Sequence, residues 1–389
     1  MTKNKKKSRK IVRTFAAASF LNDMGSDIIY PIWPLFVTQL LKANMAALGF
    51  LDGLGEALVS ISKFASGYFS DRLKKRKIFI WTGYLCGALS RIGYAASSVW
   101  THLIPFRILD RSGKIRSSPR DALVADISSS KDRGKNFGFL RAMDHLGAVC
   151  GILICIAFFN LFGYRLLFAL AAIPSLISAG LVFFLIKERK TEKIKLYKGL
   201  TLKALNKNFK LFLILSAVFT LGAFSYSFLL IFAKEAGFKT GFVPVLYLVF
   251  TAVDSLFSIP MGKISDRIGR KPVLFFSFFL WTLVLVCFIL GKSTVWVAAG
   301  FIFYGAHKGA LEPVQTTYVC ELAPNSFRAS ALGGYQMIMG LFTFPASFMA
   351  GLLWESWGMI APFYFSLFLT IIAGVLLLFV KKEKSISSP

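Results

Sequence analysis

Long apolar runs separated by short polar segments cover almost the whole chain. Several approach or exceed the roughly 20 residues that an α-helix needs to cross a bilayer. Eleven helices follow from the runs, at 14–40, 46–69, 78–98, 137–160, 164–187, 209–233, 242–263, 273–290, 294–322, 329–353 and 360–381. The pattern predicts an all-α polytopic membrane protein.

Composition agrees with this interpretation. Hydrophobic residues make up 56% of the 389 residues and charged residues only 17%, an apolar load that soluble proteins rarely reach because they must cover a surface with polar groups. The five cysteines lie singly within apolar runs, so they predict neither a disulfide framework nor a metal site. We expect no bound metal and no cofactor.

The net charge of +27 would suit a nucleic-acid partner, but the placement of the basic residues argues against one. About thirty of the 46 Lys and Arg residues lie in the segments 3–13, 72–77, 131–135, 187–210, 267–271 and 381–384, and the other connectors hold about five. Basic residues concentrate in the cytoplasmic loops of membrane proteins. We therefore expect a monomeric, multi-pass protein of the cell (inner) membrane with both termini cytoplasmic.

The stretch RILDRSGKIRSSPRDALVAD at 107–126 carries eight charged residues and resembles a solvated loop. However, the runs 78–98 and 137–160 each follow a basic segment of the cytoplasmic type, so the chain must cross the membrane once more between them. Only residues 100–127 are available for that crossing. The count of crossings thus predicts a twelfth, highly charged transmembrane helix, the fourth in chain order.

A shift of 195 residues aligns the chain with itself over about 70 residues without a gap. The aligned pairs include Gly67 with Gly262, Asp71 with Asp266, and Asp126 with Glu321. Duplicated helical halves with a substrate site between them are typical of secondary transporters. The repeat predicts six-helix bundles at 1–187 and 209–389, joined by a basic cytoplasmic linker at 188–208.

Two loop motifs lie at matching positions of this repeat, GYFSDRLKKRK at 67–77 and GKISDRIGRKP at 262–272. Both resemble the motif Gly-x-x-x-Asp-Arg-x-Gly-Arg-Arg/Lys of the major facilitator superfamily, and the resemblance covers the whole chain. The matching positions are Gly67, Asp71 and Arg72 in the first copy, and Gly262, Asp266, Arg267, Gly269 and Arg270 in the second. Lys74 replaces the second glycine of the first copy, so we expect a different turn there.

The resemblance implies two pseudo-symmetric bundles that rock about a central cavity lined by the first, fourth, seventh and tenth helices. The stretch 107–113 lies where family members often have an arginine and a glycine associated with proton coupling. Ile152 stands where many antiporters of the family have proline, which disfavours antiport. The fourth helix also resembles that of a prokaryotic branch with poorly defined substrates.

The loop motif has a physical interpretation as well. A carboxylate just past a helix end can cap the N-terminus of a neighbouring helix, so Asp71 and Asp266 are expected to latch the cytoplasmic side in one state and release it in the other. The alternative is a simple cluster of charges that orients the chain.

Charged side chains inside a membrane cost at least ~2.5–3.5 kcal/mol each on insertion scales and usually face a cavity or one another. At 100° per residue, one stripe of the fourth helix gathers Arg107, Asp110, Arg111, Lys114 and Asp121. Asp110 is placed to pair with Lys114, whereas Arg116 and Arg120 are expected to extend to the interface. The stripe is either part of the transport path or a salt-bridge network between helices.

The first and fifth helices hold further candidates. Asp23 and Asp27 lie one turn apart, with Tyr30 close by, and are interpreted as coupling or substrate groups or as partners of the fourth-helix cations. Asp144 beside His145 suits a proton relay. A packed neutral histidine is the alternative for His145.

The tenth and second helices complete the set. Lys308 and Glu312 lie one turn apart and are the cavity candidates of the second half, with Glu312 also a proton-coupling candidate. On the second helix, Asp52, Glu56 and Lys63 are interpreted as a pairing network.

Together these features predict a secondary active transporter of a small anionic or chelating solute, driven by protons. The fixed cations on the fourth helix and at Lys308 favour an anion. If Asp23, Asp27 and Glu312 neutralise them, the site would instead suit a cation or a metal ion. The alternative function is uptake or efflux of metal ions, siderophores or lipophilic drugs by the same fold. The sequence contains no nucleotide-binding loop, catalytic constellation or soluble output domain, so we expect neither a membrane-embedded enzyme nor a sensor.

Overall fold

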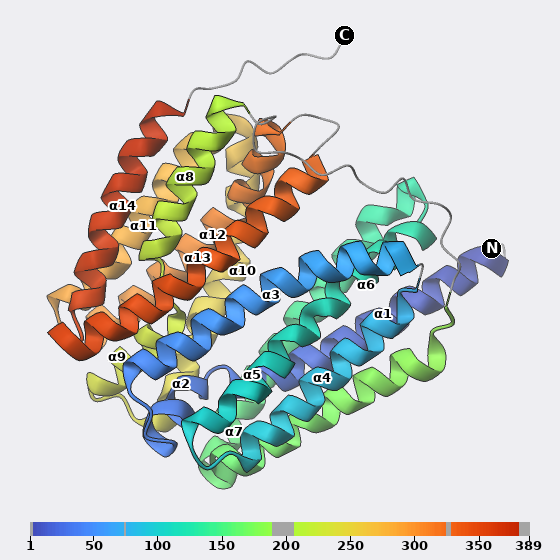
Figure 1. Ribbon diagram of the computed structural model, residues 1–389, viewed down its shortest axis with the longest axis horizontal. Coiled ribbons are helices and arrows are strands. Elements are labelled where there is room, and N and C mark those ends of the chain that lie inside the picture. The colour runs from blue at the N-terminus through green and yellow to red at the C-terminus, as the bar shows by residue number, and fades with distance from the viewer. Residues whose placement is uncertain (1–2, 74, 189–205, 324–327, 381–389) are drawn as a thin grey trace. The chain divides into compact units, whose positions relative to one another are not determined.

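The structure is a computed structural model that describes residues 3–73, 75–188, 206–323 and 328–380 (Figure 1). In chain order its α-helices are α1 (Lys3–Ile29), α2 (Trp33–Leu35), α3 (Met45–Leu73), α4 (Lys77–Ala96), α5 (Leu103–Ser112), α6 (Ser117–Ile127), α7 (Ser130–Leu185), α8 (Lys207–Gly222), α9 (Tyr226–Glu235), α10 (Val243–Ile268), α11 (Arg270–Leu290), α12 (Thr294–Leu322), α13 (Arg328–Trp357) and α14 (Ala361–Phe379). No β-strand occurs within the described ranges.

Within these ranges the helices form twelve segments of membrane-spanning length. The α1–α2, α5–α6 and α8–α9 pairs each make one interrupted segment, and α7 is two helices that meet at Gly163, whose φ of 63° breaks the helix. Seven of the described helical stretches are long and apolar enough to cross a membrane by length and composition alone, α7 counting once. The predicted all-α fold of twelve helices is confirmed, and the charged stretch 107–126 is helical rather than a loop.

The described residues fall into two compact units. The first comprises Met1–Leu196 with Lys239–Val245, and the second comprises Tyr197–Phe238 with Leu246–Pro389. The linker predicted at 188–208 lies almost entirely outside the described residues, so the bundle limits drawn from the sequence stay a prediction.

Pairs of glycines bring helices into close contact in both units. A Cβ atom at Gly147 or Gly151 of α7 would lie 2.3 or 2.2 Å from a backbone oxygen of α1. In the second unit, a Cβ at Gly305 or Gly309 of α12 would lie 2.4 or 2.6 Å from a backbone oxygen of α10. Small residues at a four-residue spacing allow such close approach in membrane helices.

The fourth membrane helix is not continuous, which corrects the single stripe predicted for it. Residues Gly113–Arg116 form a 3₁₀ turn between α5 and α6. Pro119 explains the break, because it has no N–H to donate to the carbonyl of Ile115 and its ring clashes with that carbonyl. A 3₁₀ turn advances 120° per residue rather than 100°, so four residues rotate the following helix by about 80°. Asp121 therefore leaves the face that carries Arg107 and Arg111.

Candidate functional site

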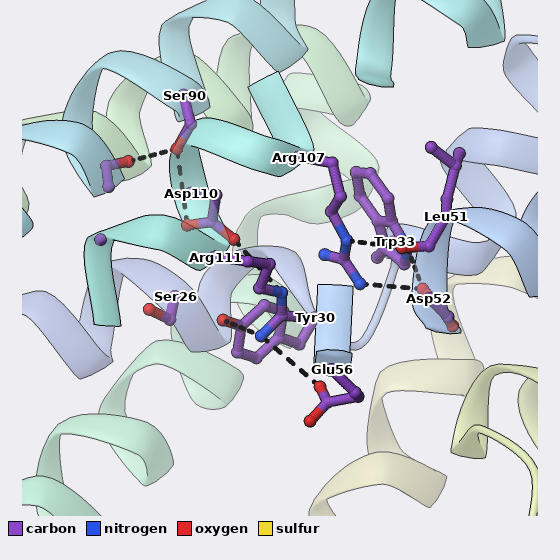
Figure 2. Close-up of polar contacts among 12 residues, drawn as sticks. Ser26, Tyr30, Trp33, Leu51, Asp52, Glu56, Ser90, Arg107, Asp110 and Arg111 are labelled. Carbon is purple, nitrogen blue, oxygen red and sulfur yellow. Dashed lines mark hydrogen bonds and ion pairs between the residues drawn. The ribbon is translucent and has the colours of Figure 1, made fainter. Parts of the chain in front are cut away.

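Arg107 of α5 is buried in a fully partnered setting (Figure 2). Its Nη2 donates to Oδ1 of Asp52 at 2.9 Å, and its Nε donates to the backbone oxygen of Leu51 at 3.3 Å. The guanidinium also lies over the ring of Trp33, 4.4 Å from the ring centre, and Nε1 of Trp33 donates to the same Asp52 oxygen at 2.9 Å. Since Asp52 is only 3% exposed, the pair neutralises two charges within the membrane interior.

Arg111 lies one turn further along α5 and is partnered much less well (Figure 2). Its Nη1 donates to the hydroxyl of Tyr30 at 3.3 Å, and its two carboxylate neighbours, Glu56 and Asp110, stand at 3.8 and 3.6 Å. Both distances exceed that of a good hydrogen bond. Its Nε is buried with no hydrogen-bond partner among the described residues.

The two arginines can therefore do different chemistry. Arg107 has its charge-assisted bond already made, whereas Arg111 keeps donor capacity in a buried position next to Glu56, whose side chain is 49% exposed. A buried donor without an acceptor costs about 1–3 kcal/mol, a cost that an anionic ligand would remove. Gly55 makes room for both guanidinium groups, since a Cβ there would lie 2.9 Å from Nε of Arg107 and 3.2 Å from Nε of Arg111.

The predicted pairing of Asp110 with Lys114 is wrong. Asp110 faces Arg111 and accepts a long hydrogen bond from Ser90 at 3.5 Å (Figure 2). The 3₁₀ turn begins at Gly113, so the i,i+4 geometry that would join the two side chains is lost. Lys114 is half-buried and makes no ion pair with the side chains that the structure describes.

A second ionic cluster lies where α6 and α7 meet. Arg120 donates from Nε to Asp121 at 3.0 Å and from Nη1 to Ser19, and its Nη1 stands 3.7 Å from Asp144. Arg141 closes a ring of alternating charges, with bonds of 3.0 Å to Asp121 and 3.1 Å to Asp144. Oδ1 of Asp144 is buried without a hydrogen-bond partner in the described part of the chain.

This cluster corrects two expectations. Arg116 and Arg120 are buried rather than extended toward the interface. Arg116 lies over the ring of Tyr84 and donates to the backbone oxygen of Gly113, because the rotation of the 3₁₀ turn directs it inward. His145 is neither packed nor part of the cluster, since its side chain is exposed and forms no hydrogen bond with Asp144 in the described residues.

The acids of the first helix are half-buried on α1. Asp23 accepts a hydrogen bond from the side chain of Asn22 at 3.0 Å. Asp27 lies one turn before Tyr30. Helix α1 ends at Ile29, and Tyr30 and Pro31 belong to the turn that leads to α2. The structure thus brings Tyr30 to Arg111, but it places Asp23 in no ion pair with a cation of the fourth helix among the described side chains.

In the second unit, Nζ of Lys308 contacts Oε1 of Glu312 at 2.9 Å, as the one-turn spacing predicts. Both groups are partly exposed. Their neighbour His307 is buried against Ser277, with Nδ1 at 2.8 Å from the backbone oxygen of that residue. The described residues contain no group of three or more His, Cys, Asp or Glu side chains placed to hold a metal ion.

The two loop motifs form matching ionic clusters. In the first, Arg76 bridges Asp71, at 3.0 Å, and Asp126. In the second, Arg270 contacts Asp266 at 2.6 Å and Glu321 at 2.8 Å. The acids of the two clusters lie 195 residues apart, as the repeat predicts, but Arg270 lies one position before the repeat partner of Arg76. The second loop turns at Gly269, whose φ is 97°. The first loop has Lys74 instead of glycine at the matching position.

Among the described residues the loop acids do not cap the helices that directly follow them, α4 and α11, and their predicted role as a latch stays a prediction. Asp71 and Asp266 stand in the last turns of α3 and α10, and Gly67 and Gly262 lie one turn earlier. The first N–H groups of α4 are instead accepted by Glu188, at 2.9 Å from Arg76 and 3.0 Å from Lys77. Arg72 and Arg267 are exposed.

Sequence reasoning missed Arg91 as a functional candidate, although a lone arginine within the run 78–98 was the available signal. The buried guanidinium donates to the backbone oxygens of Asn22 and Ala171, at 3.1 and 3.0 Å, and to the hydroxyls of Ser26 and Ser175. It ties α4 to α1 and α7 without a carboxylate partner in the described residues.

Comparison with known proteins identifies the family. The family model described as Major Facilitator Superfamily matches residues 15–254 and 212–389. An uncharacterized MFS-type transporter of Methanocaldococcus jannaschii is 33% identical over 97% of this chain and 96% of its own. Multidrug resistance protein 2 of Bacillus subtilis is 26% identical over 94% of this chain and 93% of its own.

Solved structures share the fold at low sequence identity. A crystal structure of a variant of the nucleoside transporter NupG has a TM-score of 0.80 at 17% identity, covering 96% of this chain and 100% of that one. A bacterial homologue of the human lysosomal transporter Spinster, inward-facing and occupied, has a TM-score of 0.77 at 13% identity, covering 96% of each chain. The chain therefore belongs to the Major Facilitator Superfamily, as a multi-pass membrane transporter of small molecules and not an enzyme.

Proposed function

We propose that the protein carries a small anionic solute by alternating access and couples that movement to protons. The observation that carries the proposal is the state of Arg111, a buried guanidinium with spare donors beside a half-exposed acid. Arginine suits this role because its planar donors match a carboxylate or phosphate in two parallel bonds. Arg107 then acts as a scaffold that holds α5 against α3 and presents its neighbour.

Lys308 is the proposed counterpart in the second unit. Lys308 and Glu312 form an i,i+4 ion pair in which both side chains are partly exposed. Such a pair is weak, so the ammonium group can exchange Glu312 for an anionic cargo at a small cost in free energy. Asp27, Tyr30 and Asp110 complete the proposed cargo environment in the first unit.

Asp144 is our first choice for the proton carrier, with Asp23 as its neighbour along the path. The support is the buried Oδ1 of Asp144, which has no hydrogen-bond donor among the described residues. A proton on that oxygen would weaken its attraction to Arg120 and Arg141 and open the ring of charges. Protonation would thereby change the contact between α6 and α7.

Uptake into proteoliposomes tests the cargo assignment. The purified protein is assayed with a panel of organic acids, metal chelates, metal ions and lipophilic drugs, with Arg111→Lys and Arg111→Gln as variants. We expect transport of one acid class to fall about 10–100-fold in Arg111→Gln and less in Arg111→Lys, a loss of about 1.4–2.8 kcal/mol of binding to the transported state. The surface variant Arg133→Gln is the control, and full activity of Arg111→Gln would remove Arg111 from the site.

A pH gradient tests the coupling. Wild-type uptake should rise with an imposed proton gradient, whereas Asp144→Asn should still exchange cargo across the membrane but lose the response to the gradient. An unchanged response in Asp144→Asn rules out this carboxyl as the carrier. Insensitivity of the wild type would remove proton coupling altogether.

Export of lipophilic compounds is the second candidate, favoured by the likeness to Multidrug resistance protein 2 of Bacillus subtilis. In that case ethidium efflux from cells would require the protein, and Arg111→Gln would leave the efflux intact.

Labelling of single cysteines introduced at Arg72 and Arg165 tests the proposed inner-membrane orientation, because only Arg72 should be reached from the cytoplasm.

A further inference from the structure

Two basic segments more than a hundred residues apart meet at one end of the first unit. The start of α1 and the junction of α6 with α7 lie at the same end of that unit (Figure 1). Between them is a cavity of about 580 Å³, lined by Arg9 and Arg13 from α1 and by Lys135 from α7. The volume falls in the range of pockets that hold small molecules, roughly 300–1,000 Å³.

The cavity has a surplus of positive charge and several neutral polar groups. Among its described lining residues the one acid is Asp132, whose carboxylate accepts from the hydroxyl of Ser129 at 3.0 Å. The same hydroxyl caps α7 by accepting from the N–H of Asp132 at 3.2 Å. The lining also includes Ser8, Ser128 and Asn136. Three cations beside hydroxyl and amide groups match the oxygens of a phosphate ester.

The depth of the cavity along the two helices indicates where such a phosphate would come from. On α1 the basic stretch KNKKKSRK gives way to apolar residues near Arg9 and Arg13. On α7 the first aromatic residue, Phe137, directly follows Lys135 and Asn136, and Phe139 comes two residues later. Cations at the junction of polar and apolar sequence lie at the level of the lipid headgroups.

An apolar stripe continues from the cavity along α7. Taken at 100° per residue, one face within about 40° holds Lys135, Phe139, Leu146 and Leu153. The three apolar side chains of this face are 43%, 53% and 49% exposed, in that order. A cationic pocket above an exposed apolar stripe matches a molecule with an anionic head and acyl chains.

We propose that this cavity binds the phosphate ester of an anionic membrane lipid in the leaflet on the side of the N-terminus. The lipid headgroup joins α1 to the α6–α7 junction, and its chains lie along the stripe of Phe139, Leu146 and Leu153. The site is separate from the proposed cargo site and does not depend on it.

Native mass spectrometry of the purified full-length protein, titrated with phosphatidylglycerol, tests the proposal. The site variant is Arg13→Gln with Lys135→Gln, and the matched control is Lys10→Gln with Arg133→Gln, which removes two cations from the same two segments but outside the cavity. We expect one tightly retained lipid, bound about 25-fold more weakly by the site variant, at roughly fivefold per cation, and within about threefold of wild type by the control. Equal weakening in both variants, or in neither, overturns the proposal.

Two further ligands separate the possible sources of the phosphate on the wild-type protein. Diacylglycerol has the chains without the phosphate, and glycerol phosphate has the phosphate without the chains. We expect both to bind at least about tenfold more weakly than phosphatidylglycerol. Equal retention of diacylglycerol would overturn the phosphate assignment, and equal affinity for glycerol phosphate would overturn the assignment to a lipid.

Discussion

The interiors of the two units differ sharply although a 195-residue offset aligns about 70 residues of one with the other. Among the described residues of the first unit six arginines are buried, namely Arg76, Arg91, Arg107, Arg111, Arg116 and Arg120. Among the described residues of the second unit no Arg, Lys, Asp or Glu is buried, and the interior consists largely of aromatic rings such as Phe219, Phe228, Trp281, Phe288 and Phe363. The units share their loop clusters and glycine contacts, but not their buried charge.

This difference shows which features the common fold needs. Close helix contacts at Gly151 and Gly309, and ionic clusters at Asp71 and Asp266, occur in both units and act on packing. Among the described residues, buried guanidinium groups occur in the first unit only, although each must be compensated within the membrane. We infer that the buried charges of the first unit serve transport rather than the common fold, and that the aromatic interior of the second unit serves packing within that unit.

The largest effect should follow from breaking the best-partnered charge. Arg107→Leu removes the cation that pairs with buried Asp52 at 2.9 Å, and should lower the free energy of unfolding by about 3–5 kcal/mol. Thermal unfolding of the purified protein in detergent measures this loss. Ile302, the repeat partner of Arg107 in the second unit, is 47% exposed, so Ile302→Ala should change stability by less than about 1 kcal/mol.

A double variant shows whether the charge itself is responsible. Arg107→Leu with Asp52→Asn removes both charges and keeps an acceptor for Nε1 of Trp33, so it should recover at least about half of the loss. No recovery would mean that packing against Trp33, rather than neutralisation, is the role of Arg107.

Next in size should be a change to a feature that the units share. Gly309→Ala places a methyl group 2.6 Å from the backbone oxygen of Asp254, which must force α10 and α12 apart at a cost of about 1–3 kcal/mol. Gly151→Ala should cost a similar amount in the first unit. The control is Gly334→Ala, which meets no atom within 4 Å, and equal melting temperatures for Gly309→Ala and Gly334→Ala would contradict the packing role.

The sequence predicts correctly the features that depend on the number of membrane crossings and on helical spacing. Apolar run lengths, the number of crossings and the 195-residue offset led to twelve helices, including the charged one at 103–127. The i,i+4 pair of Lys308 and Glu312 also follows from helical spacing alone. These predictions hold because each rests on local geometry that tertiary packing does not alter.

Contacts between helices could not be predicted in the same way. A helical wheel for the fourth helix fails beyond Gly113, because Pro119 makes the preceding turn 3₁₀ and rotates Asp121 and Arg120 to new neighbours. The selection of Asp52 as the partner of Arg107 depends on how α3 and α5 cross at Gly55. No spacing within either helix encodes that crossing.

The ionic clusters of the two loop motifs differ in how deeply their arginines are buried. Arg76 is 4% exposed at its side chain and bridges two acids, whereas Arg270 makes a similar bridge at 14% exposure with more exposed partners overall. Arg76→Ala should therefore cost about 1.5–3 kcal/mol and Arg270→Ala about 0.2–1 kcal/mol. Chemical unfolding of the two variants side by side measures the difference, and a reversed order would show that the second cluster is the tighter one.

The smallest effect should come from the ionic pair of the second unit. Lys308 and Glu312 are 35% and 60% exposed at their side chains, so a double-mutant cycle with Lys308→Gln and Glu312→Gln should give a coupling of only about 0.3–0.5 kcal/mol. A pair this weak adds little to the fold, and its placement at a membrane helix is then better explained by exchange of partners during transport. A coupling above about 2 kcal/mol would instead assign the pair to structure, and it would remove Lys308 from the proposed cargo site because an anion could not displace Glu312.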